Sequence, residues 1–362
     1  MPEPARGPLD PRPAVQVIAE YDSPESRARA ARRSGLPPEQ IVKLDTNENL
    51  YGPSPRLAEA LSRGCYQEYP DPLQEEVRAA TAEYVGVGEE HLLFGNGADE
   101  LIDLLMRAYL DPGDEMLSFP PTFGMYALGA QHFAARTVEV ERDQRFDLPI
   151  EAALAAVSPR TRLIFVAAPN NPTGNQVALE AVEALLGTGR LVVLDEAYAE
   201  FAGRSLAGQV PDRENLVVLR TFSKWAGLAG LRAGYGVFPL RVIRHLWKLK
   251  PPFNLNVAAE IAIRVSLEDR DWLLANVQKI VDERERLISA LEEIPSLRPY
   301  PSAANFVLCD VEGRAAAEVR ASLAARGVLV RAYRDPRLAS SIRITVGRPR
   351  DSEALLAALA QL

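Results

Sequence analysis

The fold is decided by residues 216–232, which read LVVLRTFSKWAGLAGLR from Leu216 to Arg232. A short apolar strand ends in a Thr-x-Ser-Lys turn at Lys224, and Arg232 follows eight residues later among glycines. Lysine suits imine chemistry because its pKa falls readily when the side chain is desolvated or lies near other cations. Hydroxyls, glycines and a nearby arginine suit a phosphate. Since a Ser-Lys pair after a strand is more often a solvated loop, the neighbouring segments must decide between the two interpretations.

Short apolar runs alternate with helical periods on both sides of this stretch. Arg162 to Ala168 and Arg190 to Leu194 are nearly continuous apolar runs, which are typical of parallel strands buried on both faces. Ala98 to Tyr109 carries apolar residues at helical spacing, so we expect a helix there. Strands separated by helices predict an α/β fold with a doubly wound, layered sheet.

We expect the chain to form two domains. Residues 46–252 carry the alternating pattern and form the larger domain. After the break at Pro251-Pro252, residues 253–362 combine a long helical stretch with three short predicted strands, which is typical of a smaller α+β domain. Residues 1–45 are expected to supply a proline-rich N-terminal arm and part of the small domain.

The composition argues against several classes of partner. The chain has 362 residues and a net charge of −8 without a block of like charges, so neither nucleic acid nor a membrane is an expected partner. Cys65 and Cys309 lie far apart, which suggests a reducing compartment without a disulfide framework. The three histidines show no ligand spacing, so we expect no metal site. Because no long apolar run and no signal-peptide pattern occur, we expect a cytoplasmic protein.

A glycine-rich motif stands where a predicted strand leads into the helix that begins at Ala98. It reads Gly95-Asn96-Gly97-Ala98-Asp99-Glu100. The amides of Ala98 and Asp99 would place unsatisfied donors at the positive end of the helix dipole, which suits a phosphate. A plain tight turn explains the same two glycines, so this motif is informative only together with the others.

Two further motifs follow predicted strands. Asn171 lies in the turn Pro169–Gly174, and Asp195 and Tyr198 lie in the segment Asp195-Glu196-Ala197-Tyr198. Ligands of open α/β sheets bind at the carboxyl ends of strands, so we expect these side chains to meet. Burying a carboxylate without a partner is costly. The partner of Asp195 is therefore either a structural arginine or a protonated ring nitrogen.

Taken together, these motifs resemble those of a fold-type I pyridoxal-phosphate aminotransferase of the aspartate aminotransferase superfamily. Within that superfamily, four segments are similar to histidinol-phosphate aminotransferases: Lys43-Leu44-Asp45-Thr46-Asn47-Glu48-Asn49, Tyr69-Pro70-Asp71-Pro72, Gly97-Ala98-Asp99-Glu100 and Ser341-Ile342-Arg343-Ile344-Thr345-Val346-Gly347. The resemblance implies a three-layer fold with a mostly parallel, seven-stranded sheet and a smaller α+β domain. It also implies pyridoxal 5'-phosphate as the cofactor and a homodimer.

The resemblance assigns the cofactor chemistry to four residues. Lys224 would hold the cofactor as a Schiff base and then move a proton between the substrate α-carbon and cofactor C4′; such transfers contribute roughly 10²–10⁴-fold. Asp195 would keep the pyridine nitrogen protonated, which makes the ring an electron sink. Asn171 and Tyr198 would hydrogen-bond the phenolic oxygen of the ring.

The resemblance also assigns groups to the cofactor phosphate and to the ring face. The phosphate would be held by the amides of Ala98 and Asp99 and by the side chains of Thr221, Ser223 and Arg232. Phe123 would stack on the ring, although a core aromatic explains the same residue. Tyr69 would reach the phosphate in the partner subunit, so the active site would need a dimer.

Arg331 and Arg343 lie near the ends of predicted small-domain strands and would take the anionic end of the substrate. The planar fork of arginine suits either carboxylate or phosphate. Because a transaminase accepts two substrates in turn, one anion site would serve both glutamate and histidinol phosphate. Tyr21 resembles a tyrosine that contacts the substrate phosphate, with an ordinary packing tyrosine as the alternative. Asn49 completes the expected substrate-binding set.

The resemblance implies transamination of L-histidinol phosphate with 2-oxoglutarate, giving imidazole acetol phosphate and L-glutamate in histidine biosynthesis. An aromatic amino-acid aminotransferase would use the same cofactor residues, and a threonine-phosphate decarboxylase would bind a different phosphorylated amine on the same fold. A transcription regulator with an aminotransferase-like domain would need an N-terminal DNA-binding module. The N-terminal segment, residues 1–45, shows no helix-turn-helix pattern for one.

Overall fold

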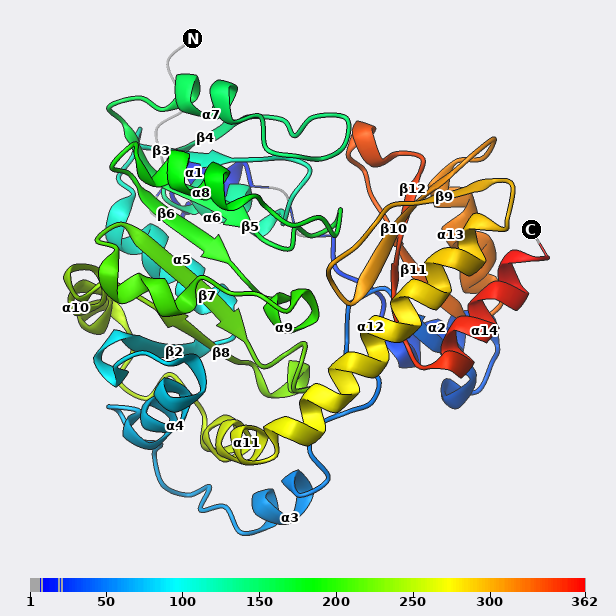
Figure 1. Ribbon diagram of the computed structural model, residues 1–362, viewed down its shortest axis with the longest axis horizontal. Coiled ribbons are helices and arrows are strands. Elements are labelled where there is room, and N and C mark those ends of the chain that lie inside the picture. The colour runs from blue at the N-terminus through cyan, green and yellow to red at the C-terminus, as the bar shows by residue number, and fades with distance from the viewer. Residues whose placement is uncertain (1–6, 8, 19, 21, 362) are drawn as a thin grey trace.

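The computed structural model describes residues 7, 9–18, 20 and 22–361, and two β-sheets organise it (Figure 1). The larger sheet has seven strands in the order β2-β8-β7-β6-β5-β3-β4. Their bounds are β2 (Leu92–Asn96), β3 (Glu115–Ser118), β4 (Arg136–Glu139), β5 (Thr161–Ala167), β6 (Leu191–Asp195), β7 (Leu216–Thr221) and β8 (Ala233–Val237). Strand β8 is antiparallel to β2 and β7, whereas the other pairs are parallel. The predicted mostly parallel, seven-stranded sheet is confirmed.

The central strands are buried on both faces, which explains their continuous apolar sequences. In β5, Leu163 and Phe165 belong to one hydrophobic layer, whereas Ile164 and Val166 belong to the layer on the other face. Successive residues of a strand point to opposite faces of the sheet. A strand that is covered on both sides therefore needs apolar residues at every position.

Helices cover both faces of this sheet. The first layer contains α5 (Ala98–Tyr109), α6 (Met125–His132) and α10 (Leu240–Leu249). The second contains α7 (Ile150–Ala156), α8 (Leu179–Leu186) and α11 (Val257–Glu268). Helix α5 has the bounds that the helical spacing predicts. Only Gly97 separates the end of β2 from the first residue of this helix.

The smaller sheet has five strands in the order β1-β11-β12-β10-β9 and lies on the right of Figure 1. Their bounds are β1 (Val42–Leu44), β9 (Leu297–Pro299), β10 (Phe306–Val311), β11 (Val328–Ala332) and β12 (Ser341–Thr345). Strand β1 pairs in parallel with β11, so an early segment of the chain completes a sheet built by the last third. Asn47, just after β1, lies between Tyr198, which precedes α9 (Ala199–Ala202), and Asn305 beside β10.

The long helical stretch predicted before the small-domain strands consists of two helices, α11 and α12 (Arg270–Glu292). They meet at Asp269, whose carboxylate accepts hydrogen bonds from the side chains of Ser54 and Arg56. Aspartate favours helix ends because its carboxylate bonds to nearby groups in place of continuing the helix. Helix α12 then runs from the larger sheet to the smaller one (Figure 1).

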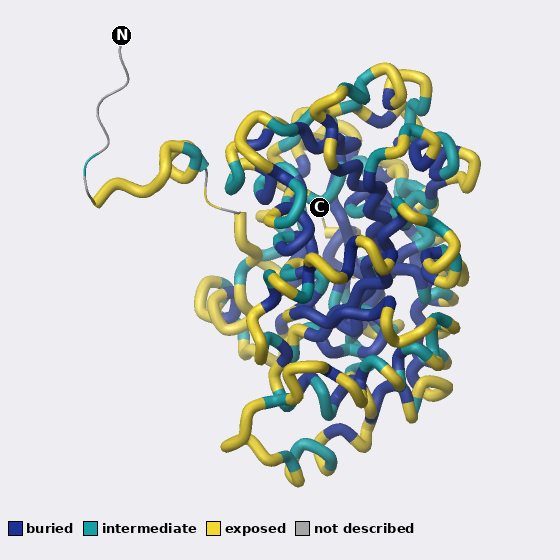
Figure 2. Tube along the Cα trace, turned by 90° about the vertical axis from the view of Figure 1, so that its left-hand side faces the viewer, coloured by how far each residue is buried: buried dark blue, intermediate teal, exposed yellow. Residues whose placement is uncertain are grey.

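The remaining α-helices of the described residues are α1 (Pro13–Gln16), α2 (Arg27–Ser34), α3 (Leu57–Ser62), α4 (Glu75–Val85), α9 (Ala199–Ala202), α13 (Ala316–Ala325) and α14 (Pro349–Leu359). Residues 9–18 of the proline-rich arm are largely exposed at the side of the body (Figure 2), although Arg12 donates to the carbonyl of His132 at 2.7 Å. No helix in the described ranges is long and apolar enough to cross a membrane. The domain bounds at residues 45 and 252 stay a prediction.

Candidate active site

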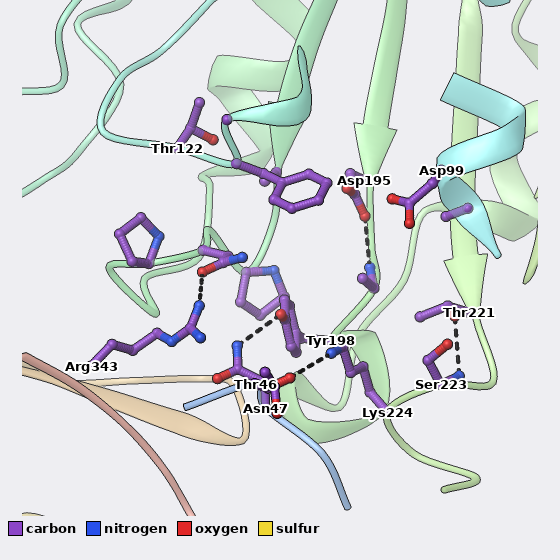
Figure 3. Close-up of a pocket in the computed structure, with 18 of the residues that line it drawn as sticks. Thr46, Asn47, Asp99, Thr122, Asp195, Tyr198, Thr221, Ser223, Lys224 and Arg343 are labelled. Carbon is purple, nitrogen blue, oxygen red and sulfur yellow. Dashed lines mark hydrogen bonds between the residues drawn. The ribbon is translucent and has the colours of Figure 1, made fainter. Parts of the chain in front are cut away.

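A cavity of about 240 Å³ opens where the carboxyl ends of β5, β6 and β7 face the start of α5 and two strands of the smaller sheet (Figure 3). Most of the predicted site residues line it: Ala98, Asp99, Phe123, Asn171, Asp195, Tyr198, Thr221, Ser223, Lys224, Arg232, Arg331 and Arg343. Parallel strands place their carboxyl ends at one edge of a sheet, so motifs far apart in the sequence meet there.

Lys224 follows β7 and lies at one end of the cavity (Figure 3). Its Nζ atom donates a hydrogen bond to the carbonyl oxygen of Thr46 at 3.2 Å and lies 5.9 Å from the centre of the Tyr198 ring. Burial, and then the charge of Arg343, lower the pKa of Lys224 to about 8. An amine with this pKa is partly neutral near physiological pH, and the neutral amine is the nucleophile and the base.

Asp195 ends β6 and is buried. It accepts hydrogen bonds from the Tyr126 hydroxyl at 2.6 Å and from the amide of Ala197 at 3.0 Å. Burial raises the pKa of Asp195, and the hydrogen bond from Tyr126 acts in the opposite direction. Within the described part of the chain its partners do not include an arginine, so the structural-arginine alternative has no support.

The start of α5 faces the cavity with its backbone. Gly97 precedes the helix with a φ of 76°, and no side chain caps the first turn. Ala98 and Asp99 therefore present amide donors at the positive end of the helix dipole. Arg232, itself in the left-handed region with a φ of 54°, donates from Nη2 to Asp99 Oδ2 at 2.9 Å.

Two hydroxyls stand opposite this helix start. Thr221 ends β7, and its Oγ1 donates to the carbonyl of Ala233 at 3.1 Å while accepting the amide of Ser223 at 3.1 Å. Both side chains are largely buried and line the cavity. The turn after β7 thus places Ser223 and Lys224 side by side (Figure 3).

Arg343 enters the cavity from β12 and is held by parts of the chain remote in sequence. Its Nη1 donates to Asn171 Oδ1 at 2.6 Å, and its Nη2 donates to the carbonyl of Asp45 at 2.7 Å. The guanidinium lies 5.4 Å from the centre of the Phe306 ring, within the range of a cation–π contact. The predicted residues Asn171 and Arg343 therefore touch each other.

Arg331, on β11, lies where the cavity meets the N-terminal segment. Its Nη2 donates to the backbone carbonyl of Asp22 at 2.7 Å and to the Asp22 carboxylate at 3.1 Å. Pro24, two residues later, also lines the cavity. The segment that contains these residues therefore borders the cavity beside the second predicted anion-binding arginine.

Two of the predicted residues, Tyr69 and Asn49, are not among the residues that line the cavity. Tyr69 is 80% exposed and stacks on Phe253 with ring centroids 4.5 Å apart. Asn49 is buried behind Lys224, where its Nδ2 donates to the carbonyl of Trp225 at 2.9 Å. Tyr21 lies outside the described residues. Within one chain, neither Tyr69 nor Asn49 contacts the space for a ligand.

Sequence reasoning missed two residues whose side chains donate a hydrogen bond to a predicted side chain. Asn47 donates from Nδ2 to the Tyr198 hydroxyl at 3.0 Å, and Tyr126 donates to Asp195. Asn47 belongs to the segment 43–49 that carries the resemblance, so that motif was a usable signal. Nothing in the sequence around Tyr126 marks it, because a tyrosine on an apolar helix face is an ordinary core residue.

These residues fit pyridoxal phosphate. The amine of Lys224, the buried carboxylate of Asp195 and the helix start at Ala98 match an aldehyde, a ring nitrogen and a phosphate, respectively. The phosphate cradle also depends on close approach of the backbone. A Cβ atom on Gly97 would lie 2.5 Å from Arg232 Nη2, and one on Gly234 would lie 2.4 Å from the Ala98 amide.

Comparison with known proteins agrees with this geometry. Residues 39–359 match the family Aminotransferase class I and II. The histidinol-phosphate aminotransferase of Roseiflexus castenholzii is 49% identical over 361 residues, covering 97% of each chain. The chloroplastic histidinol-phosphate aminotransferase of Nicotiana tabacum is 46% identical and covers 96% of this chain and 85% of its own.

Solved structures give the same result. The crystal structure of histidinol-phosphate aminotransferase from Sinorhizobium meliloti in complex with pyridoxal-5'-phosphate superposes with a TM-score of 0.87 at 26% identity. The match covers 99% of this chain and 98% of that one. The chain therefore belongs to the class I and II aminotransferase family and, within it, to the histidinol-phosphate aminotransferases.

Proposed function

We propose that the protein transfers the amino group of L-histidinol phosphate to 2-oxoglutarate, giving imidazole acetol phosphate and L-glutamate in histidine biosynthesis. The observation that carries the proposal is that Lys224, with a pKa of about 8, shares one cavity with Arg331 and Arg343. The lysine supplies a reactive amine, and the two guanidiniums supply a site for an anion. The names and high identity of the relatives support this pair of substrates over others.

The roles of the large-sheet residues follow from their places. Bound pyridoxal phosphate supplies an electron sink for the bond that breaks at the substrate α-carbon. Lys224 would hold the cofactor and then take and return the proton of the substrate α-carbon. Asp195 would hold a proton on the ring nitrogen, and Tyr198, kept in place by Asn47, would donate to the ring oxygen together with Asn171. Phe123 lines the cavity and would cover one face of the ring.

The phosphate of the cofactor would lie at the start of α5. There the amides of Ala98 and Asp99 face the cavity, and Thr221, Ser223 and Arg232 line its edge. Because Arg232 is already paired with Asp99, its charge is partly balanced before the phosphate binds. Arginine still has free donors in this arrangement, since its fork carries five N–H groups.

Arg331 and Arg343 would take the anionic end of each substrate in turn. Histidinol phosphate ends in a phosphate and 2-oxoglutarate in a carboxylate, and a guanidinium binds both. We also propose that Tyr21 contacts the substrate phosphate. Asn49 would act indirectly, because it holds the carbonyl of Trp225 next to Lys224.

The proposal includes a cytoplasmic homodimer in which Tyr69 reaches the cofactor phosphate of the partner subunit. Its support in this chain is the stacked pair of Tyr69 and Phe253, which are 80% and 43% exposed. Large apolar side chains that gather on a surface mark an interaction site. Tyr69→Ala should therefore weaken both the dimer and the affinity for the cofactor, measured by sedimentation and by titration.

Half-reactions test the substrate assignment. Cofactor-loaded protein is mixed with histidinol phosphate and, separately, with phenylalanine, and the loss of the cofactor absorbance is followed. We expect histidinol phosphate to react far faster, because two arginines in the cavity favour an anionic side chain. Faster conversion with phenylalanine would assign an aromatic aminotransferase. Release of carbon dioxide from threonine phosphate would assign a lyase. The L-threonine-O-3-phosphate decarboxylase from Porphyromonas gingivalis is 22% identical to this chain, and that likeness shows a shared fold only.

A further inference from the structure

Tyr126 is a fully buried residue of α6, and its hydroxyl reaches the carboxylate at the end of β6. It donates a hydrogen bond to Asp195 Oδ2 at 2.6 Å. The other carboxylate oxygen, Oδ1, accepts the amide of Ala197 at 3.0 Å. Both oxygens of Asp195 are therefore anchored, one by the backbone after its own strand and one by a side chain from a helix on the sheet face.

The ring of Tyr126 is fixed by aromatic contacts on two sides. It stacks on Phe165 of β5 with ring centroids 4.9 Å apart and 21° between the planes. Phe123 meets it edge-on at 5.6 Å. Tyrosine has only two side-chain torsions to the ring, so this packing also fixes the position of the hydroxyl. The hydroxyl cannot leave Asp195 unless the core around β5 rearranges.

The electrostatic environment of Asp195 makes the hydrogen bond from Tyr126 important. Burial raises the pKa of Asp195, and the largest influence that lowers it is the hydrogen bond from Tyr126, ahead of the amide of Ala197. Of the nearby charged groups, Asp99 raises this pKa and Lys224 lowers it. The hydrogen bond from a neutral hydroxyl is therefore the largest single influence that favours the charged form of the buried carboxylate.

Tyr126 also influences a buried cation, Arg142. Arg142 is 2% exposed, and burial lowers its pKa to about 10, with Tyr126 as the largest influence in the opposite direction. Its Nε and Nη1 donate to the carbonyls of Phe119 and Phe146, whereas Nη2 has no partner within the described residues.

We propose that Tyr126 is a positioning residue that holds the Asp195 carboxylate in the orientation in which it meets the ring nitrogen of the cofactor. The inference rests on the proposed function for the role of Asp195. Removing the hydroxyl keeps the ring and its stacking but takes the donor from one oxygen of a buried carboxylate. Such a carboxylate takes up a proton at a higher pH, and its Oδ2 atom is no longer held in one position.

The test is the variant Tyr126→Phe, examined as cofactor-loaded and cofactor-free protein. We expect the dissociation constant for pyridoxal phosphate to rise by up to about 100-fold. The full effect of one hydrogen bond to a charged group is the upper limit, because this bond is already present in the cofactor-free protein. The low-pH transition in the absorbance of the bound cofactor should also move to higher pH. Tyr235→Phe is the matched control: Tyr235 is equally buried, its hydroxyl has no partner in the described ranges, and it lies outside the cavity.

A double-mutant cycle separates positioning from a general packing effect. If Tyr126 acts through Asp195, Tyr126→Phe should weaken cofactor binding by less than about threefold in an Asp195→Asn background. Equal losses in both backgrounds, or a single variant with unchanged affinity and an unchanged transition, would overturn the proposal. These measurements need no amine substrate. Failure of histidinol phosphate to react would therefore overturn the proposed function and leave this result standing.

Discussion

The two sides of the cavity are built in different ways. The large-sheet side consists of groups at strand ends and at the start of α5: Ala98, Asp195, Thr221, Ser223 and Lys224. The small-sheet side consists of Arg331 and Arg343 with the segment at Asp22. Groups on the large-sheet side stand at or directly after the end of a strand, or at the start of a helix, whereas those on the small-sheet side are long side chains held by remote segments. In the proposed function, the large-sheet side binds the cofactor, and the small-sheet side binds the anionic end of the substrate.

Loss of the amine on the large-sheet side should have the largest effect on activity. Lys224→Ala removes the cofactor link and the base together, so we expect kcat to fall by at least about 10³-fold. Steady-state turnover of histidinol phosphate measures this loss. Lys279→Ala is the control, because Lys279 lies on α12 and donates to Asn276 outside the cavity. Turnover of the Lys224 variant at the rate of the unaltered protein would refute the mechanism.

Lys224 should also lower the free energy of unfolding of the cofactor-free protein. Its pKa is about 8 in the folded chain, below its ordinary value of 10.5. Between these two pH values the unfolded chain binds more protons, so the unfavourable contribution of Lys224 is complete below pH 8 and disappears as the pH rises towards 10.5.

Lys224→Met should therefore stabilise the cofactor-free protein at pH 7 by up to about 3 kcal/mol while abolishing activity. Urea unfolding at pH 7 and at pH 10 measures the gain, which should shrink at the higher pH. Equal gains at both pH values would show that packing, and not charge, causes the effect.

On the small-sheet side, the shape of the guanidinium should matter more than its charge. Arg343→Lys keeps the charge. A lysine has a single nitrogen, however, so it cannot replace the two planar guanidinium nitrogens that donate to Asn171 and to the Asp45 carbonyl. We expect KM to rise about tenfold or more for both anionic substrates, with the protein still able to bind the cofactor. Arg337→Lys is the control, since Arg337 donates to the carbonyls of Arg142 and Asp143 outside the cavity. An unchanged KM would remove Arg343 from substrate recognition.

The large-sheet side could be predicted from the sequence because each of its groups is local. Lys224 and Asp195 stand at the ends of apolar runs, and α5 has the helical spacing that fixes its first residue at Ala98. The topology of parallel strands then brings these ends together. The same local reasoning does not predict the order of the strands, because periodicity does not report which strands pair.

The small-sheet side could not be predicted in the same way. Arg343 and Asn171 are 172 residues apart, and Arg331 and Asp22 are 309 residues apart. No local pattern encodes such partners, because they depend on how the two sheets pack. The Tyr126 contact, 69 residues from Asp195, was missed for this reason. Asn49 differs from these residues, since its side chain donates to the backbone carbonyl of Trp225 next to Lys224, and its part in substrate binding stays a prediction.

Loss of the contact between Asp22 and Arg331 should have the smallest effect on KM. It is nevertheless the most direct test of how the small-sheet side of the cavity is held. The two side chains are 44% and 15% exposed, and such a pair contributes at most about 1 kcal/mol, or roughly fivefold in affinity. Asp22→Asn removes the charge but keeps the backbone carbonyl that binds the same Nη2 atom. If Asp22 orients Arg331 for binding an anion, the KM of the variant should exceed that of the unaltered protein by up to about fivefold at low salt. At high salt the two KM values should be equal.

Glu25→Gln, which removes a carboxylate paired with Arg33, is the control. A fall in KM would instead mean that Asp22 competes with the substrate, so that an anion must displace this part of the chain before it binds.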